Sequence, residues 1–572
     1  MLSIYTSIQP GLSPAPEGLS SAPEGLSPNS PALQGRVLIW FISDLVHYKP
    51  GLKRPGYSEK APPGLKRKPR PSDVAAQYMP ARLHFSPQLR YNTLMTIVSE
   101  LPGILPAETA PIPSGRGSYS VLTWGCQMNE DDSTQMALML EADGYLPAAS
   151  VEEASVILLN TCSVRAKPER KVYSKLGELR ELKALNPNLV IGVCGCMAQK
   201  EAPEIRRRAP YVDLVVGTGQ IDRIPALVER VRQERVKIIA TELPSRKDRN
   251  DKATPLRVIG GLAPKLKTFV SISYGCDKFC AFCIVPITRG KERSRPADEI
   301  VLEVERLASL GTREVTLLGQ TVNSYGKFLD DPCTFAHLLE RLNAIEGIER
   351  IRYTSPYPKD FNQDVINAIA HLPKVCEQVH MPVQVGDDNL LKRMGRGYTL
   401  DQYKDIVGRL RSAVPDVGLT TDIMLGFPGE THAEFENTMQ FMAETRYDSA
   451  FMFAYSPREG TKAAVLEDQI PEEVKLDRLH QLIALQNEIT LERNASQVGN
   501  IYEVLVERRS PKDAAKWTGL NRQGKTINFP AQRDLLGQLV RVKAVKSHLW
   551  GFTGEMLPAR SERGLELMMA ED

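Results

Sequence analysis

The sequence predicts an α/β protein with an N-terminal open parallel α/β domain, a central partial (β/α)6 barrel and a small C-terminal β-barrel. The first two parts are indicated by short apolar runs that alternate with longer amphipathic stretches, from about 117 to 240 and from 267 to 457. The third part is indicated by short β-like runs, punctuated by glycine and Asn or Asp, between 500 and 556. We predict domain boundaries at 116–255, 256–492 and 493–560, followed by a tail at 561–572.

Residues 1–115 differ from the rest in composition. The run Pro16-Glu17-Gly18-Leu19-Ser20 returns as Pro23-Glu24-Gly25-Leu26-Ser27, and Pro50-Gly51-Leu52-Lys53-Arg54 returns as Pro63-Gly64-Leu65-Lys66-Arg67. Repeats of Pro, Gly and Ser bury too little apolar surface to offset the entropy of ordering. We therefore expect a low-complexity, disordered extension that carries no chemistry.

Composition limits the kind of protein. A hydrophobic content of 42% with 25% charged residues is typical of a soluble globular protein. The net charge of +3 means that any affinity for nucleic acid must come from local patches. Nine cysteines that occur in groups fit metal ligands in a reducing cytoplasm better than a secreted disulfide framework. No uncharged run approaches the roughly 20 residues that span a bilayer, so we expect a cytoplasmic protein that does not enter the membrane.

In the first domain, three cysteines stand where predicted strands end. Cys126, Cys162 and Cys196 each follow one apolar run. The predicted strands are Tyr119–Trp124, Ala154–Asn160, Leu189–Val193 and Val212–Val216, and the predicted helices include Ser133–Ala142 and Lys171–Leu185. Ligands collect outside the carboxyl ends of the strands in open α/β sheets, so these cysteines should converge on a second metal cluster. Each one taken singly would more often be an inert buried residue, and Cys194 is a rival to Cys196.

The central part repeats the alternation six times, which predicts a partial barrel with its chemistry at the carboxyl ends of the strands. The predicted strands are Thr268–Ser273, Glu314–Leu318, Arg350–Thr354, Gln378–Val383, Gly418–Gly426 and Ser449–Tyr455. Helical stretches between them include Ile300–Ser309, Phe335–Ala344, Tyr403–Val414 and Ala433–Glu444, and a further helix is predicted from Pro471 to about Arg493.

Cys276, Cys280 and Cys283 lie in one loop directly after the first barrel strand. A structural zinc site needs four protein ligands, and the ten residues after Cys283 contain no further Cys or His. Three thiolates on a short loop instead suit a 4Fe–4S cluster with one open iron. A zinc clip or a coincidental group of cysteines is the alternative.

The C-terminal segment combines predicted strands with interleaved basic residues. The strands are Ile501–Glu507, Thr526–Phe529, Leu539–Ala544 and Leu549–Thr553. The basic residues are Arg508, Arg509, Lys512, Lys516, Arg522, Lys525, Arg541, Lys543 and Lys546. A solvated face would explain them, but their place on a separate small barrel favours a surface that binds phosphates, because neutralised phosphates supply most nonspecific affinity. We expect Arg508, Lys525, Arg541 and Lys543 to contact RNA.

These motifs together resemble one family. The runs Thr123-Trp124-Gly125-Cys126-Gln127-Met128-Asn129 and Cys283-Ile284-Val285-Pro286-Ile287-Thr288-Arg289-Gly290, and the order of the two cysteine sets, are similar to the methylthiotransferases of the radical S-adenosylmethionine (SAM) superfamily, in particular the MiaB-type tRNA enzymes. The resemblance covers about residues 117–558. It identifies the three parts as a methylthiotransferase domain, a radical SAM core and an RNA-binding TRAM module.

The resemblance implies methylthiolation at carbon 2 of N6-isopentenyladenosine at tRNA position 37, next to the anticodon. It implies two 4Fe–4S clusters, a SAM-binding one on Cys276, Cys280 and Cys283 and a second one on the first-domain cysteines. SAM would serve as both methyl donor and radical source, because an aromatic C–H bond gives acid–base catalysis little to act on. The implied partners are a tRNA anticodon stem-loop, an electron donor such as flavodoxin or ferredoxin, and an unidentified sulfur source. The protein itself is expected to be a monomer.

Residues that would contact SAM follow the barrel strands. They are Gly319, Gln320, Gln384, Asp422, Gly426 and Glu430. Arg289 and Arg293 follow the cluster loop, where they would either pair with a carboxylate or phosphate or lie on the surface. The run Val385-Gly386-Asp387-Asp388 replaces a Ser-Gly-Ser usual in the family, and Leu520 stands where the TRAM module often has Arg.

Two alternatives remain open from the sequence. The substrate could be threonylcarbamoyl-adenosine in tRNA or an aspartate of a ribosomal protein. A noncatalytic Fe–S or zinc RNA-binding protein would explain the cysteines and the basic barrel, but it leaves the six βα units unexplained.

Overall fold

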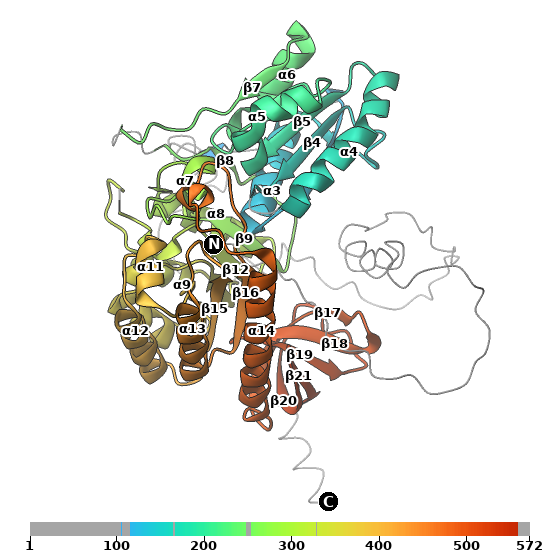
Figure 1. Ribbon diagram of the computed structural model, residues 1–572. Helices are drawn as coiled ribbons and strands as arrows, with labels where there is room; N and C mark the ends of the chain where they lie inside the picture. The colour runs from blue at the N-terminus through green and yellow to red at the C-terminus, as the bar shows by residue number, and fades with distance from the viewer. Residues whose placement is uncertain (1–103, 106–114, 164–165, 248–252, 328, 559–572) are drawn as a thin grey trace, which may run out of the picture. The chain divides into compact units, whose positions relative to one another are not determined.

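The computed structural model describes residues 104–105, 115–163, 166–247, 253–327 and 329–558 (Figure 1). All of these residues belong to one compact unit. Most of the predicted extension at 1–115 lies outside the described residues, although β1 (Ile104–Leu105) pairs in parallel with β8 (Arg257–Val258). None of the described helices is long and apolar enough to cross a membrane.

The N-terminal domain is an open sheet of six parallel strands in the order β3-β2-β4-β5-β6-β7. The strands are β2 (Ser118–Trp124), β3 (Leu146–Pro147), β4 (Val156–Thr161), β5 (Val190–Gly195), β6 (Leu214–Val216) and β7 (Ile238–Ala240). The sequence predicted β2, β4, β5 and β6 but not the two short edge strands.

Helices cover both faces of this sheet. The helices are α3 (Gln127–Ala142), α4 (Ala166–Leu185), α5 (Cys196–Arg208) and α6 (Ile224–Glu234). Alternate residues of β4 point to opposite faces, as the two-residue period of a strand requires. Leu158 packs in a core with residues of α3 and α6, whereas Leu159 packs in a second core with residues of α4 and α5. The predicted parallel α/β domain is confirmed.

The central part is the predicted partial barrel. Its six strands are β9 (Lys267–Ser271), β12 (Glu314–Leu318), β13 (Arg350–Tyr353), β14 (Gln378–His380), β15 (Gly418–Leu425) and β16 (Ser449–Ala454). They form two parallel three-stranded sheets, β13-β12-β9 and β14-β15-β16, joined by one parallel bridge between Ile351 and Val375. The helices are α7 (Val285–Thr288), α8 (Ala297–Ser309), α9 (Phe335–Asn343), α10 (Gln363–His371), α11 (Asp388–Arg393), α12 (Leu400–Ala413), α13 (His432–Thr445) and α14 (Glu472–Ala495).

The first predicted barrel strand differs from the observed one. Ile272 separates β9 from β10 (Ser273–Tyr274), and β10 pairs in antiparallel register with β11 (Arg293–Ser294). The chain therefore leaves the barrel wall after Ser271, five residues before Cys276, and the segment that follows the cysteine loop returns as β11 to pair with β10.

The C-terminal part is a closed barrel in the order β17-β18-β19-β21-β20. The strands are β17 (Ile501–Ser510), β18 (Asp513–Asn521), β19 (Thr526–Pro530), β20 (Leu539–His548) and β21 (Gly551–Met556). Val504, Ile527, Phe529 and Phe552 fill its centre. The predicted small β-barrel is confirmed, and β18 is a strand that the sequence did not predict.

Arginine side chains join this small barrel to the central one, and two of them, Arg350 and Arg352, are buried. Arg350 donates to the Leu520 carbonyl at 2.7 Å, and Arg352 donates to the Asn521 carbonyl at 2.8 Å. Arg522 forms an ion pair with Glu377 at 2.7 Å. The turn between β18 and β19 therefore packs against the amino ends of the central strands.

Candidate active site

Cys276, Cys280 and Cys283 lie in the loop between β10 and α7 and face one small cavity, which Gln320, Tyr357 and other residues complete. Main-chain hydrogen bonds hold the loop, from the Cys276 amide to the Gly290 carbonyl (3.2 Å) and from the Ala281 amide to the Met394 carbonyl (2.8 Å). Burial raises the pKa of Cys276 to about 11 and the pKa of Cys283 to about 12. Ionising these thiols at neutral pH therefore needs a bound cation.

Arg396 places a positive charge at this loop. Its guanidinium lies 3.5 Å from the Cys280 sulfur and over the rings of Tyr357 and Tyr398, with 4.7 and 5.1 Å to the ring centroids. The side chain is buried. A fixed cation beside a thiolate ligand stabilises the more reduced state of a metal centre. The sequence does not predict this role for Arg396, because its position after α11 carries no local signal.

The cysteine loops fit iron–sulfur clusters better than one metal ion. Among the described residues, no group of three or more His, Cys, Asp or Glu side chains is close enough together to ligate a single ion. A zinc ion would need four such ligands. Thiolates of an iron–sulfur cluster bind different irons, so they converge on a cavity without all meeting at one point.

Cys126, Cys162 and Cys196 follow β2, β4 and β5, which are adjacent parallel strands. All three are buried. Burial alone would raise the pKa of Cys126, but a hydrogen bond with Cys162 and the charge of Arg289 lower that pKa overall. Burial raises the pKa of Cys196, and Arg289 offsets part of this effect. Cys126 therefore interacts with both Cys162 and Cys196 at the carboxyl ends of the strands.

Two glycines allow this convergence. Gly125 has a φ of +157°, and a Cβ there would lie 2.7 Å from the Asn129 side chain and 2.9 Å from Cys162. Gly195 has a φ of +87°, and a Cβ there would lie 2.2 Å from the Asn160 side chain. Asn129 and Asn160 are hydrogen-bonded to each other at 3.0 Å. The glycine before Cys126 and the one before Cys196 thus let the strand ends close around a buried amide pair.

Arg289 lies between the two domains, in contact with the second cysteine set. Its guanidinium pairs with Asp132 of α3 at 2.7 Å, and both side chains are buried. The sequence left open whether Arg289 pairs with a carboxylate or lies on the surface, and the structure shows the carboxylate pair. Nearby, Arg257 makes two-pronged contacts with Asp131 and Glu303 at 2.7–3.1 Å.

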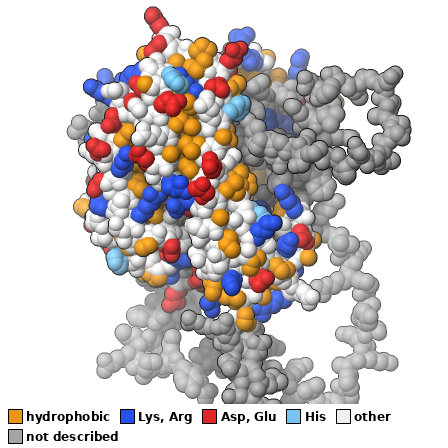
Figure 2. Space-filling model, turned by 60° about the horizontal axis from the view of Figure 1, so that its bottom comes forward, with side chains coloured by type: hydrophobic (Ala, Val, Ile, Leu, Met, Phe, Trp, Pro, Cys, Tyr) orange, Lys and Arg blue, Asp and Glu red, His pale blue; other side chains and the backbone are white. Residues whose placement is uncertain are grey.

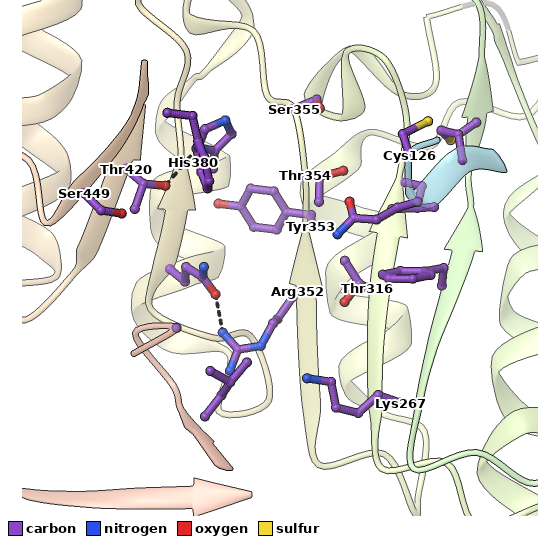
Figure 3. Close-up of a pocket in the computed structure, with 18 of the residues that line it drawn as sticks. Cys126, Lys267, Thr316, Arg352, Tyr353, Thr354, Ser355, His380, Thr420 and Ser449 are labelled. Atoms are coloured by element: carbon purple, nitrogen blue, oxygen red, sulfur yellow. Dashed lines mark hydrogen bonds between the residues drawn. The ribbon is translucent and has the colours of Figure 1, made fainter. Parts of the chain in front are cut away.

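A cavity of about 390 Å³ connects Cys126 and Cys196 of the second cysteine set to the lumen of the central barrel. Figure 3 shows Arg352, Tyr353, Thr354 and Ser355 in succession along one wall, His380, Thr420 and Ser449 across from them, and Cys126 at one end. Lys525, Trp550 and other residues of the small barrel complete the lining. Val285, Gln320 and Ser355 line both this cavity and the one at Cys276. The two cysteine sets therefore open onto adjoining spaces.

The structure separates the predicted SAM contacts into two groups. Gly319 and Gln320 line the large cavity, and Gln320 also lines the small one. The other four predicted residues, Gln384, Asp422, Gly426 and Glu430, are not among the described residues that line either cavity.

These four residues have structural contacts instead. The Asp422 carboxylate lies 3.3 Å from the His380 ring, and His380 lines the large cavity. The Gly426 amide donates to the Glu430 carboxylate at 3.0 Å, and Glu430 pairs with Arg478 of α14 at 2.6 Å. Gln384 is buried with a φ of +82° and exchanges main-chain hydrogen bonds with β15.

The four residues predicted to contact RNA differ in how far they are exposed to solvent. Arg508, Arg541 and Lys543 are exposed. Lys525 is buried, lines the large cavity, and pairs with Asp448 at 2.8 Å. Burial lowers the pKa of Lys525, and Asp448 opposes this shift. On the face shown in Figure 2, acidic and basic side chains are interspersed with hydrophobic ones.

Comparisons with known proteins agree with this architecture. Residues 118–217 match the family described as "Uncharacterized protein family UPF0004", residues 270–442 match the radical SAM superfamily, and residues 495–557 match the TRAM domain. A solved radical SAM methyltransferase, TsrM from Kitasatospora setae, aligns with 12% identity and a TM-score of 0.44 over 63% of this chain and 76% of its own.

Curated relatives are much closer. The tRNA-2-methylthio-N(6)-dimethylallyladenosine synthase of Moorella thermoacetica is 46% identical over 453 residues, 77% of this chain and 99% of that protein. The proteins of the same name from Clostridium botulinum (strain Okra) and Clostridium perfringens (strain SM101) are 45% and 44% identical over 441 residues, 77% of this chain and 97% of each relative.

The site and the three matched families define a radical SAM enzyme with an appended TRAM domain. At this level of identity, the chain belongs to the MiaB-type methylthiotransferase family. Its chemistry accordingly depends on iron–sulfur and SAM, and the noncatalytic RNA-binding alternative is not supported.

Proposed function

We propose that this protein adds a methylthio group to carbon 2 of N6-isopentenyladenosine at position 37 of tRNA. The observation that carries the proposal is the adjoining pair of cavities, since each contains cysteines of one set and the two share Val285, Gln320 and Ser355. The relatives named for this product support the choice of substrate over threonylcarbamoyl-adenosine or a protein aspartate.

Each cysteine set would hold one 4Fe–4S cluster. Cys276, Cys280 and Cys283 would bind the cluster that also binds SAM, and Cys126, Cys162 and Cys196 would bind the second. When bound, these groups supply one-electron chemistry and the methyl and sulfur atoms that an unreactive aromatic C–H bond requires. Arg289, which contacts the second set, would balance the charge of its thiolates.

The protein's own contribution is binding and orientation. Gln320 lines both cavities, so its amide can contact a ligand that spans them. We assign Gly319 and Gln320 to direct SAM contact. Asp422 would orient the ring of His380, which lines the large cavity. Gly426 and Glu430 would attach the loop after β15 to α14. Gln384 would shape the main chain beside β15.

The partners follow from the reaction. We propose an anticodon stem-loop of tRNA as substrate, a one-electron donor such as flavodoxin or ferredoxin, and a monomeric enzyme working in the cytoplasm. Arg508, Arg541 and Lys543 are exposed on the TRAM barrel and would contact phosphates. The TRAM domain and the names of the relatives support RNA as the substrate.

Nucleoside mass spectrometry of tRNA tests the proposal. Cells that lack the protein should lose 2-methylthio-N6-isopentenyladenosine and accumulate N6-isopentenyladenosine. The wild-type gene should restore the product, and a Cys280→Ala gene should not. An unchanged nucleoside pool in the deletion strain would remove tRNA as the substrate, and the ribosomal protein would then be examined for a methylthio group.

A further inference from the structure

Trp550 is an exposed aromatic side chain at the tip of the turn between β20 and β21. Its side chain is 54% exposed. A large apolar ring that stays in water contributes little to folding, whereas aromatic rings at accessible positions commonly bind partners. The ring therefore requires an explanation outside the core of the small barrel.

The turn that carries Trp550 is firmly attached. Asn494 of α14 donates from its side-chain amide to the carbonyls of His548 (2.8 Å) and Leu549 (3.3 Å). Gly551 has a φ of +137°, and a Cβ there would lie 2.0 Å from the Thr526 carbonyl oxygen. The turn is thus attached to the last helix of the central barrel on one side and to β19 on the other, so the backbone at Trp550 is held at a defined position.

Trp550 also lines the cavity that contains Cys126 and Cys196. Leu549 and Gly551 on either side of it line the same cavity. A group that enters from solvent and reaches the cysteines therefore occupies a space that this exposed ring borders.

We propose that Trp550 stacks on an unpaired base of the substrate RNA, the loop nucleotide next to the adenosine that enters the cavity. This inference rests on the proposed function. An enzyme that modifies a base at its ring must take that base out of the stack. The neighbouring base then loses a stacking partner, and an aromatic side chain can replace it.

Stacking can be distinguished from phosphate binding by its dependence on salt. Loss of a stacked aromatic removes affinity without changing the number of released counterions, whereas loss of a phosphate contact lowers the salt slope. Lys543 is exposed on β20 and is the matched cationic control. Leu536 is 58% exposed on the same barrel and is not among the residues that line the cavity, which makes it the matched apolar control.

The experiment measures binding of an anticodon stem-loop RNA to the full-length protein with its clusters, without reductant or SAM. The RNA carries N6-isopentenyladenosine and a fluorescent 2-aminopurine as its 3′ neighbour.

We expect Trp550→Ala to raise Kd about tenfold with an unchanged salt slope, and Trp550→Phe to retain most of the affinity. Leu536→Ala should bind like wild type, and Lys543→Ala should lower the salt slope by about one. The 2-aminopurine fluorescence should be quenched by wild type and not by Trp550→Ala.

Equal Kd values for Trp550→Ala and Leu536→Ala would overturn the inference. The same holds if the Trp550→Ala loss is as large for a fully paired duplex, or if this variant still quenches the 2-aminopurine. The test is separate from that of the proposed function. If the deletion strain keeps its 2-methylthio nucleoside, the proposed function fails, while the comparison of the two variants still decides the role of Trp550.

Discussion

Cys194 and Cys196 are two residues apart at the end of β5, yet their surroundings differ. Cys194 packs in the apolar core with α3 and α6, and burial raises its pKa to about 12. Cys196 lies beside Cys126 and Arg289. The sequence left Cys194 as an alternative to Cys196, and these surroundings favour Cys196 as the cluster ligand.

Iron content should separate the two cysteines. We expect Cys196→Ala to lower bound iron from about eight to about four atoms per chain, as the loss of one of two 4Fe–4S clusters requires. Cys194→Ala should keep the full amount, because its thiol faces hydrocarbon. Iron and sulfide assays on anaerobically reconstituted protein provide the measurement. Equal iron loss in both variants would contradict the assignment.

Arg396 should raise the reduction potential of the cluster that we propose at Cys280. Its guanidinium lies 3.5 Å from the sulfur, and a hydrogen bond to a charged group is worth about 1.5–3 kcal/mol. If roughly 1 kcal/mol of that distinguishes the two redox states, Arg396→Met lowers the potential by about 40 mV for one electron. A redox titration followed by electron paramagnetic resonance measures the shift. Arg393→Met, which removes a half-exposed arginine from the adjacent helix, should leave the potential unchanged.

The cysteines could be predicted from sequence because their spacing is local, with one loop for the first set and one strand end each for the second. Arg396 and Asp132 could not be predicted, because the partners that define their roles are far away in the chain. Cys280 lies 116 positions from Arg396, and Asp132 lies 157 positions from Arg289.

The turn between β18 and β19 connects two domains and also lines the large cavity. Lys525 contacts Asp448 at 2.8 Å and the Asn494 side chain at 2.9 Å. Gln523, Gly524 and Lys525 line the large cavity. This single turn therefore ties the TRAM barrel to the last strand and helix of the central barrel.

Lys525→Ala should destabilise the protein more than a surface substitution. It leaves Asp448 buried, with Arg493 as a remaining partner at 3.1 Å, so we expect a loss of about 2 kcal/mol, less than the 3–5 kcal/mol for a fully uncompensated buried charge. Urea unfolding measures the difference. Lys543→Ala, at an exposed position, should stay within about 0.5 kcal/mol of wild type. A Lys525→Ala protein as stable as Lys543→Ala would show that the Asp448 pair contributes little.

The strands that the sequence missed have identifiable causes. β3 and β7 have two and three residues, which is too short for a two-residue period to emerge. β18 begins with Asp513-Ala514-Ala515-Lys516, a stretch without the β-branched or aromatic residues that usually mark a strand. Its pairing with β17 and β19 forms it despite that composition.

At the scale of the molecule, buried ion pairs join the N-terminal domain to the central barrel. Asp132 and Arg289 belong to different domains and are both buried. Arg289→Met should destabilise the protein by about 3–5 kcal/mol, because it leaves the Asp132 carboxylate without this charge partner. Asp132→Asn with Arg289→Met should restore part of the loss and give a coupling energy of about 2 kcal/mol.

Urea unfolding of the two single variants and the double variant completes this cycle. The exposed pair of Arg230 and Glu234 on α6, at 2.9 Å, is the matched control and should show a coupling below about 0.5 kcal/mol. Additive effects at Asp132 and Arg289 would show that the domains are not coupled through this pair.

The cavity wall supplied by the TRAM barrel has a consequence for biosynthesis. About 240 positions separate Cys283 from Lys525, and a ribosome needs roughly 10–50 s to add them. All six cysteines of the two sets therefore leave the ribosome well before the residues that complete the cavity around Trp550. Clusters inserted during translation would bind while the cavity still lacks its TRAM residues. Clusters inserted after release would bind in the complete cavity.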